Sequence, residues 1–358
     1  MRIDQLTFTR FIAAMAIVVY HFGRAVPPFD HPALSPLLHH ANLGVSYFYI
    51  LSGFVMMVAY YKDNSTLILP AAYYKNRFAR IYPMYLLALL LVVFYDGISS
   101  LNQYPVSLVL SLFGLQAWHP PSALQLNYPG WSISVELFFY ALFPWLFNRF
   151  YRNYTFHQLL LGVAAIWVLS QLFFNLALHS SFYRDFPSNR ANALFYFPLM
   201  HVNEFLVGNI AGLFVVKNQN RRLKYSDICI LLLAAAMIVL LRADLSVNFH
   251  NGLLAVFIAP SVILFSLSRG WFAKLCTTGP LQFLGEISFG IYILQVPVYL
   301  FCYSLLTRWG IKNYTILFYL YCLGLILIAA LFYRLVEVPL RTRIKNYRKP
   351  GKLLLQKA

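Results

Sequence analysis

The chain has 358 residues, of which 60% are hydrophobic and only 11% are charged, and its mean hydropathy is +0.64. Soluble globular domains carry roughly a quarter charged residues, so a water-exposed surface over the whole chain is hard to build. The formal net charge of +17 would suit a nucleic-acid-binding protein. The basic residues, however, form short clusters between apolar segments rather than one continuous face. We therefore expect a protein of the lipid bilayer with no nucleic-acid partner.

Long apolar segments recur along the whole chain. A helix needs about 20 apolar residues to cross the hydrocarbon of a bilayer, and ten segments approach that length. The ten expected spans are 6–25, 43–61, 81–95, 131–147, 159–178, 194–216, 225–241, 252–267, 281–306 and 314–335. The expected fold class is therefore all-α, a polytopic transmembrane helix bundle. A further apolar stretch, 106–118, is short and precedes His119-Pro120-Pro121, so we expect a re-entrant or interfacial segment on the outer face.

The positive-inside rule orients this bundle. With ten spans and both termini in the cytoplasm, most of the 28 Lys and Arg residues fall on the cytoplasmic side. They include the cluster Arg221, Arg222 and Lys224 and the basic residues that follow Leu340. We expect one transmembrane domain, 1–340, followed by a basic cytoplasmic tail, 341–358, that lies along the inner leaflet.

Two ionisable residues share one face of the first span. Arg10 and His21 are eleven residues apart, which is close to three whole turns and separates them by roughly 16 Å along the helix axis. Charged side chains inside a bilayer are rare and usually functional. With the N-terminus inside, Arg10 lies toward the cytoplasm and His21 toward the outer face. The structural alternative is that both side chains snorkel to the lipid headgroups.

The fourth span carries a carboxylate. Glu136 follows Ser132 by four residues, so the two side chains are neighbours on the helix surface. A carboxylate at this depth must be protonated, paired or exposed to a wet cavity. The topology places Glu136 at a depth similar to that of His21, and a carboxylate beside an imidazole can orient a general base. A purely structural hydrogen bond between helices is the alternative.

Basic residues also mark the inner ends of the third and last spans. Arg77 and Arg80 are neighbours on a helix, and two guanidinium groups can bind one phosphate. Such residues are equally ordinary as topology signals. Glu337 is expected to pair with Arg341 one turn later in a structural role. The four cysteines have no metal-ligand spacing, so no metal site is expected.

Six motifs resemble those of the acyltransferase-3 family of polytopic membrane O-acyltransferases, in the same order along the chain. They are Arg10 with His21, 44–54, Arg77-Phe78-Ala79-Arg80-Ile81-Tyr82-Pro83, 131–136, 288–295 and Glu337-Val338-Pro339-Leu340-Arg341. Each motif alone is degenerate, whereas the six together form a specific signal that runs through most of the chain. The chain departs from the family at Gln295, where many relatives have a histidine, so we assign no catalytic role there. It also lacks the acidic residue that usually comes just before the first-span arginine.

The resemblance implies a stand-alone O-acyltransferase of the bacterial plasma or inner membrane. The donor would be cytoplasmic acyl-CoA, most often acetyl-CoA, used as a co-substrate, with no cofactor bound permanently. The acceptor would be a hydroxyl of a membrane-presented or exported molecule, such as a surface polysaccharide or a lipid-linked sugar.

The same resemblance suggests a role for each candidate residue. Arg77 and Arg80 would hold the phosphates of the donor, and its acyl-pantetheine arm would pass along the Arg10 side of the first span. His21 would act as a general base or carry the acyl group itself. Glu136 would orient His21, and the Ser132 hydroxyl would donate to the oxyanion.

Two other functions fit the same residues. A cation, a base and a carboxylate within a bundle also occur in proton-coupled transporters and exporters, although no inverted halves stand out. A scaffold in a glycan-assembly complex would need none of Arg10, His21 and Glu136. The sequence separates neither direct transfer from an acyl-enzyme intermediate nor a monomer from a homodimer.

Overall fold

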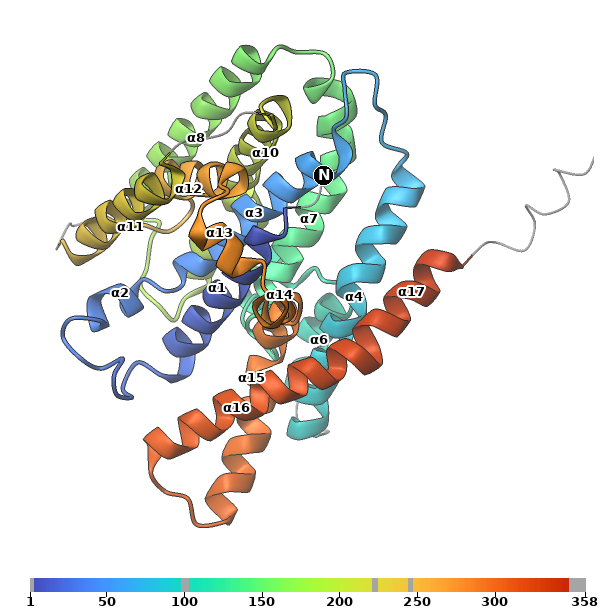
Figure 1. Ribbon diagram of the computed structural model, residues 1–358. Coiled ribbons are helices and arrows are strands. Elements are labelled where there is room, and N and C mark those ends of the chain that lie inside the picture. The colour runs from blue at the N-terminus through green and yellow to red at the C-terminus, as the bar shows by residue number, and fades with distance from the viewer. Residues whose placement is uncertain (1–2, 98–102, 221–224, 244–246, 348–358) are drawn as a thin grey trace, which may run out of the picture.

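The computed structural model describes residues 3–97, 103–220, 225–243 and 247–347. Every regular element in these ranges is helical (Figure 1). The expected cytoplasmic cluster Arg221, Arg222 and Lys224 and the end of the basic tail, 348–358, lie outside the described residues.

The helices follow one another with short connections. The first half of the chain forms α1 (Gln5–Phe22), α2 (Ser35–His39), α3 (Leu43–Tyr60), α4 (Pro70–Asp96), α6 (Pro105–Leu112), α7 (Gly130–Leu146) and α8 (Phe156–Leu178). The second half forms α9 (Asn189–Phe195), α10 (Val202–Lys217), α11 (Ser226–Arg242), α12 (Ala255–Leu267), α13 (Trp271–Cys276), α14 (Gly279–Glu286), α15 (Ser288–Arg308), α16 (Tyr314–Phe332) and α17 (Val338–Asn346). One π-helical turn, Phe147–Tyr151, extends α7, and another, Tyr333–Glu337, joins α16 to α17.

Among the described residues, eight helical segments are long and apolar enough to cross a bilayer. The surface of α8 shows why a bilayer is the expected surrounding, because Leu161, Leu169 and Leu176 are 70%, 64% and 71% exposed. Large leucines on one exposed stripe are unfavourable in water and favourable against lipid chains. The expected polytopic helical bundle is thus confirmed. The count of ten spans and the cytoplasmic location of both termini stay predictions.

Several expected spans differ from the helices that form. The third helix begins at Pro70 rather than at residue 81, because Arg77 and Arg80, which precede the expected span, belong to the same helix. The expected span 194–216 is interrupted by a short turn between α9 and α10, and 281–306 is divided at Ile287 into α14 and α15. Average apolar composition does not reveal such breaks, because the polar residues near them, such as His201 and Glu286, are few within long apolar stretches.

The segment 106–118 does not form a spanning helix. It forms α6, whose eight residues rise only about 12 Å, and then short turns. Further along, the Asn127 side-chain amide donates a 3.0 Å hydrogen bond to the carbonyl of Ile293 in α15. Pro297 lies four residues after Ile293 and has no N–H to give that carbonyl. The proline therefore leaves the Ile293 carbonyl without its usual helical donor, and Asn127 donates to it instead.

Glycines bring α3 and α10 into close contact. A Cβ atom on Gly208 would lie 2.0 Å from the carbonyl oxygen of Ile50, and one on Gly53 would lie 2.1 Å from that of Phe205. Small residues at such positions let transmembrane helices approach at backbone distance. Gly53 and Gly208 therefore allow α3 and α10 to pack backbone against backbone.

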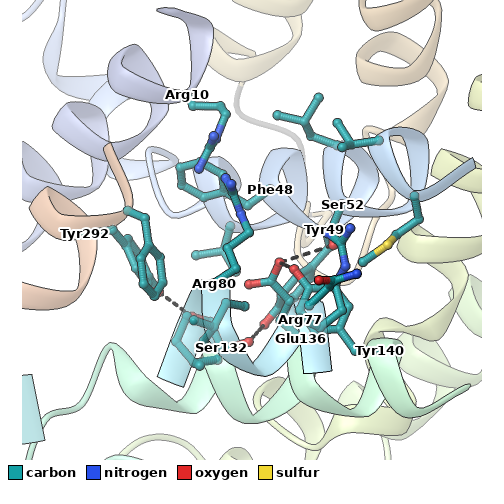
Figure 2. A pocket seen from close by; sticks show the side chains of 18 of the residues that line it. Arg10, Phe48, Tyr49, Ser52, Arg77, Arg80, Ser132, Glu136, Tyr140 and Tyr292 are labelled. Atoms are coloured by element: carbon teal, nitrogen blue, oxygen red, sulfur yellow. Dashed lines mark hydrogen bonds between the residues drawn. The ribbon is translucent and has the colours of Figure 1, made fainter. Parts of the chain in front are cut away.

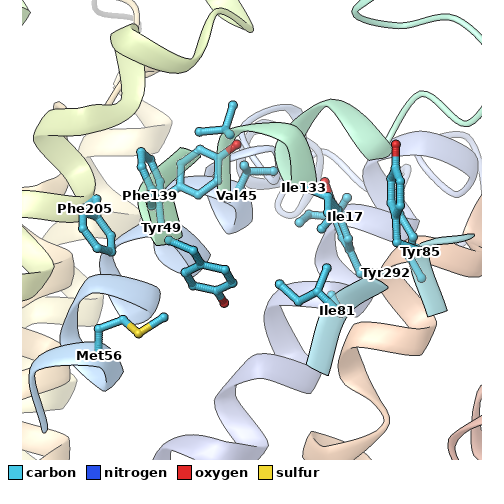
Figure 3. Packing of buried hydrophobic residues seen from close by; sticks show 14 of the residues in the cluster. Ile17, Val45, Tyr49, Met56, Ile81, Tyr85, Ile133, Phe139, Phe205 and Tyr292 are labelled. Carbon is cyan, nitrogen blue, oxygen red and sulfur yellow. The ribbon is translucent and has the colours of Figure 1, made fainter. Parts of the chain in front are cut away.

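Aromatic rings fill the space beside this contact (Figure 3). The ring of Tyr49 lies 5.2 Å from that of Phe139, which stacks on Phe205 at 4.7 Å. Tyr49, Phe139 and Ile133 are all buried in one core cluster. This core fixes α7 against α3 and α10, and it determines which face of α7 points into the bundle.

Candidate active site

A cavity of about 360 Å³ lies among α1, α3, α4, α7, α15 and α17 (Figure 2). This volume lies within the range of small-molecule sites. The polar residues that line it are Arg10, Tyr49, Ser52, Tyr60, Asn76, Arg77, Arg80, Ser132, Glu136, Tyr140, Tyr292, Arg341 and Lys345. We call it the arginine-lined cavity. It brings together five of the six candidate residues, and the sixth, His21, is not part of its lining.

Glu136 is held by two hydroxyl groups. Its Oε1 atom accepts a hydrogen bond of 2.5 Å from Tyr140, one turn later on α7, and one of 3.2 Å from Ser52 on α3. Figure 2 shows this carboxylate beside Ser52, Arg77 and Tyr140. Two donors on one oxygen satisfy an ionised carboxylate, which accepts but does not donate. Glu136 is therefore held in one orientation in the wall of the cavity.

Ser132 belongs to a second small network. Its hydroxyl lies 2.9 Å from the carbonyl of Pro129 and 2.7 Å from the hydroxyl of Tyr292, and Tyr292 also lies 3.2 Å from the same carbonyl. The hydroxyl groups of Ser132 and Tyr292 thus contact each other, and both also contact the carbonyl of Pro129. To bind an oxyanion, one of these hydroxyl groups would have to give up a hydrogen bond that it makes here. The oxyanion role of Ser132 stays a prediction, and Tyr292 lies beside it.

His21 lies at the last turn of α1 and contacts α15. Its Nδ1 atom is 2.7 Å from Oε1 of Gln295, and its ring meets the edge of Tyr128 at 4.9 Å between centroids. The hydrogen bond that we expected between Glu136 and His21 is not formed among the described residues. Each side chain bonds to another partner instead: His21 to Gln295, and Glu136 to Ser52 and Tyr140.

A chain of contacts nevertheless connects the two groups. The Gln295 side chain, which bonds to His21, also donates to the carbonyl of Tyr292 at 2.6 Å. The hydroxyl of Tyr292 bonds to Ser132, which is one turn from Glu136 on α7. Ser132 and Tyr292 therefore lie between His21 and the carboxylate.

Arg77 is enclosed by tyrosine rings. Its guanidinium carbon lies 5.4, 5.8 and 5.7 Å from the ring centroids of Tyr60, Tyr73 and Tyr140, and Nη2 donates to the Tyr60 hydroxyl at 3.2 Å. Among the described residues its buried Nε atom has no hydrogen-bond partner. Such an atom costs about 1–3 kcal/mol when unsatisfied, and the oxygen of an anionic ligand can satisfy it.

Two cations of α17 complete the lining. Arg341 and Lys345 are one turn apart, and Arg341 also bonds to Glu337 at 3.4 Å, so the expected structural pair is confirmed. The arginine-lined cavity has five cationic side chains and one carboxylate, a formal excess of four positive charges. A second cavity of about 440 Å³ shares Arg10, Arg80 and Arg341 with it. The arrangement favours a ligand with several negative charges.

Comparison with known proteins identifies the family of the chain. The sequence profile of a family described as an acyltransferase domain matches residues 3–334. The chain belongs to the acyltransferase-3 family. It is similar to the acyltransferase MdmB of Streptomyces mycarofaciens, with 34% identity over 163 residues, which are 42% of this chain and 41% of that protein. The chain thus matches about two-fifths of the length of this curated relative. No solved structure matches the chain.

The chain therefore has an acyltransferase domain, and eight of its described helical segments are long and apolar enough to cross a membrane. The structure adds that each of the six motifs contributes a side chain to the arginine-lined cavity. The contributions come from α1, α3, α4, α7, α15 and α17, so motifs that are far apart in sequence meet at one site.

Sequence reasoning missed several residues of this site. Tyr140 is four residues after Glu136, a spacing that could have indicated the contact. Gln295 and Tyr292 lie within a recognised motif, but their bonds to α1 and α7 have no local signal. Arg341 was assigned only to a structural pair and Lys345 only to the tail.

Proposed function

We propose that the protein transfers an acetyl group from cytoplasmic acetyl-CoA to a hydroxyl of a membrane-presented acceptor, a surface polysaccharide or a lipid-linked sugar, in a bacterial plasma or inner membrane. The observation that carries this proposal is the excess of four positive charges around the arginine-lined cavity. A CoA thioester brings a pyrophosphate and a further phosphate, and guanidinium groups bind phosphate oxygens in bidentate fashion.

In this proposal Arg77, Arg80 and Arg341 bind the phosphates at the cytoplasmic side. The pantetheine arm extends past Arg10 toward Ser132 and Tyr292. An amide N–H of the arm donates to Glu136, whose charge also offsets the surrounding cations. The unpartnered Nε of Arg77 supports this placement, because a phosphate oxygen would satisfy it.

The chemical step is acyl transfer with His21 as the base. Nε2 of His21 takes the proton of the acceptor hydroxyl while the oxygen attacks the thioester carbonyl. The carbon–sulfur bond then breaks, an ester forms, and the thiolate receives the proton from the imidazolium. If His21 carries the acyl group first, the products are the same. The Ser132 hydroxyl, assisted by Tyr292, donates to the oxyanion in either route.

Release of free thiol from acetyl-CoA by the purified protein, with membranes that contain the acceptor, tests this proposal. His21→Ala should abolish the release while the protein remains folded in the membrane. Mass spectra of surface glycans from cells with and without the protein should differ by one acetyl unit. Thiol release by the His21→Ala variant at the wild-type rate would show that His21 is not the base.

A further inference from the structure

We infer that Gln295 is a positioning residue that holds the His21 imidazole in its Nδ1–H tautomer and leaves Nε2 free for the acceptor hydroxyl. This inference rests on the proposed function, in which His21 is the base. It concerns a position to which the sequence motifs assign no role.

The orientation of the Gln295 amide follows from its partners. The side chain is completely buried, and its Nε2 atom lies 2.6 Å from the carbonyl oxygen of Tyr292. A carbonyl only accepts hydrogen bonds, so the atom that faces it must be the NH₂ group. The amide oxygen therefore points the other way, and it lies 2.7 Å from Nδ1 of His21. No rotation of the amide by 180° preserves both bonds.

This orientation determines the proton on His21. An amide oxygen has no proton, so Nδ1 must be the donor in the bond to Gln295. A neutral imidazole has one N–H, and Nε2 then carries the lone pair that a general base needs. His21 itself is only partly buried. Nδ1 is thus occupied by its bond to the buried Gln295, and Nε2 is the nitrogen that could accept a proton from the substrate.

The other neighbours of His21 do not accept a hydrogen bond from its Nδ1 atom in the described structure. Arg24, one turn later in the chain, is a cation without an acceptor atom, so it cannot accept the Nδ1 proton. The neighbouring rings of Tyr20 and Tyr128 meet the imidazole edge-on, at 5.4 and 4.9 Å. Gln295 forms the side-chain hydrogen bond to His21 in the described structure.

The helix that carries Gln295 is anchored at this turn. The Tyr321 hydroxyl on α16 donates to the Gln295 main-chain carbonyl at 3.0 Å, and Asn127 donates to Ile293 half a turn earlier. Contacts from two other segments therefore fix the backbone of the glutamine. A rigid support of this kind is what a residue needs in order to hold a catalytic group in place.

Two substitutions of similar size separate positioning from packing. Gln295→Met removes the acceptor that faces Nδ1. Gln295→Glu keeps an acceptor there, but it replaces the donor that faces the Tyr292 carbonyl with a second oxygen and adds a carboxylate. If Gln295 positions His21, the Met variant should lose about 10–100-fold in kcat with an unchanged KM for acetyl-CoA, and the Glu variant should retain at least ten times the kcat of the Met variant. If Gln295 only packs, the order reverses, because methionine suits a buried site and a carboxylate does not.

Gln171→Met is the matched control. Gln171 is also buried, and its Nε2 donates to the Asn251 carbonyl at 2.8 Å, but it lies on α8, away from the site. We expect this variant to lose thermal stability and to keep its kcat. Wild-type kcat in Gln295→Met, with His21→Ala inactive, would overturn the inference and leave the proposed function intact. A wild-type protein that releases no thiol from acetyl-CoA would overturn both.

Discussion

Tyr140 donates a hydrogen bond of 2.5 Å to Glu136, the residue one turn before it on α7. Together with Ser52 it fixes the carboxylate inside the arginine-lined cavity rather than against His21. The structure thus separates two groups that the sequence suggested would touch. This separation has a kinetic consequence.

Glu136→Gln should raise the KM for acetyl-CoA about tenfold, the effect of losing one charge-assisted hydrogen bond of roughly 1.4 kcal/mol. It should change kcat by less than a few-fold, because glutamine keeps an acceptor for Ser52 and Tyr140. Steady-state kinetics of the purified variant check this expectation. A kcat lowered by several orders of magnitude at unchanged KM would instead indicate a direct partner of the catalytic histidine.

Arg341→Gln should weaken donor binding, because Arg341 lines both the arginine-lined cavity and the second cavity beside it. We expect a rise of about tenfold in the KM for acetyl-CoA that becomes smaller at high ionic strength. Arg343→Gln is the matched control, since Arg343 lies on the same helix, is exposed and does not line the cavity. Equal effects of the two substitutions would mean that only the general positive charge of α17 matters.

Gly208→Ala should destabilise the bundle, because the added Cβ would lie 2.0 Å from the carbonyl oxygen of Ile50. Overpacking of this kind costs about 1–3 kcal/mol or more. The contrasting substitution is Gly162→Ala on α8, where a Cβ meets nothing within 4 Å. Thermal unfolding in detergent should therefore show a lower midpoint for the first variant and no decrease for the second. Equal midpoints would contradict the close contact of α3 with α10.

His250, in the connection before α12, should make the protein sensitive to acid. Burial, followed by the nearby His201, lowers the pKa of His250 to about 3, although its bond to the Phe195 carbonyl opposes the shift. The unfolded chain binds this proton below about pH 6.5. Stability is therefore complete above pH 6.5 and falls by up to about 1.4 kcal/mol per unit as the pH decreases from 6.5 toward 3.

His250→Gln keeps a donor and an acceptor at this position and removes the titration. Its unfolding midpoint should change less than that of the wild type between pH 7 and pH 4.5. The exposed His31 serves as the control, and His31→Gln should follow the wild-type curve. A wild-type slope in the His250→Gln variant would assign the acid sensitivity to another group.

The apolar runs were sufficient to predict a helical membrane bundle, and the motifs were sufficient to predict that Arg10, Arg77, Arg80, Ser132 and Glu136 would meet. The partner of Glu136 could not be predicted, because its hydrogen bond to Ser52 depends on how α3 packs against α7. The breaks around Pro198 and Ile287 were missed because the average hydropathy stays high across them, although Pro198 itself and the polar Glu286 and Ser288 mark the two positions.

The contact of His21 with Gln295 could not be predicted from the sequence. The two residues are 274 positions apart, and a hydrogen bond over such a separation depends on how α1 and α15 cross. Gln295 is also surrounded by apolar residues, so its neighbours in sequence give no sign of a polar partner. Only the packed structure shows which nitrogen of His21 it faces.

The stretch before α7 is attached twice to the helix that carries Gln295: Asn127 bonds to Ile293, and Tyr292 bonds to Pro129. A displacement of this stretch should therefore shift α15 and change the orientation of the His21 imidazole, which bonds to Gln295. Insertions or substitutions between 119 and 129 should then alter the position of Nε2 of His21, although none of those residues needs to contact the acyl donor.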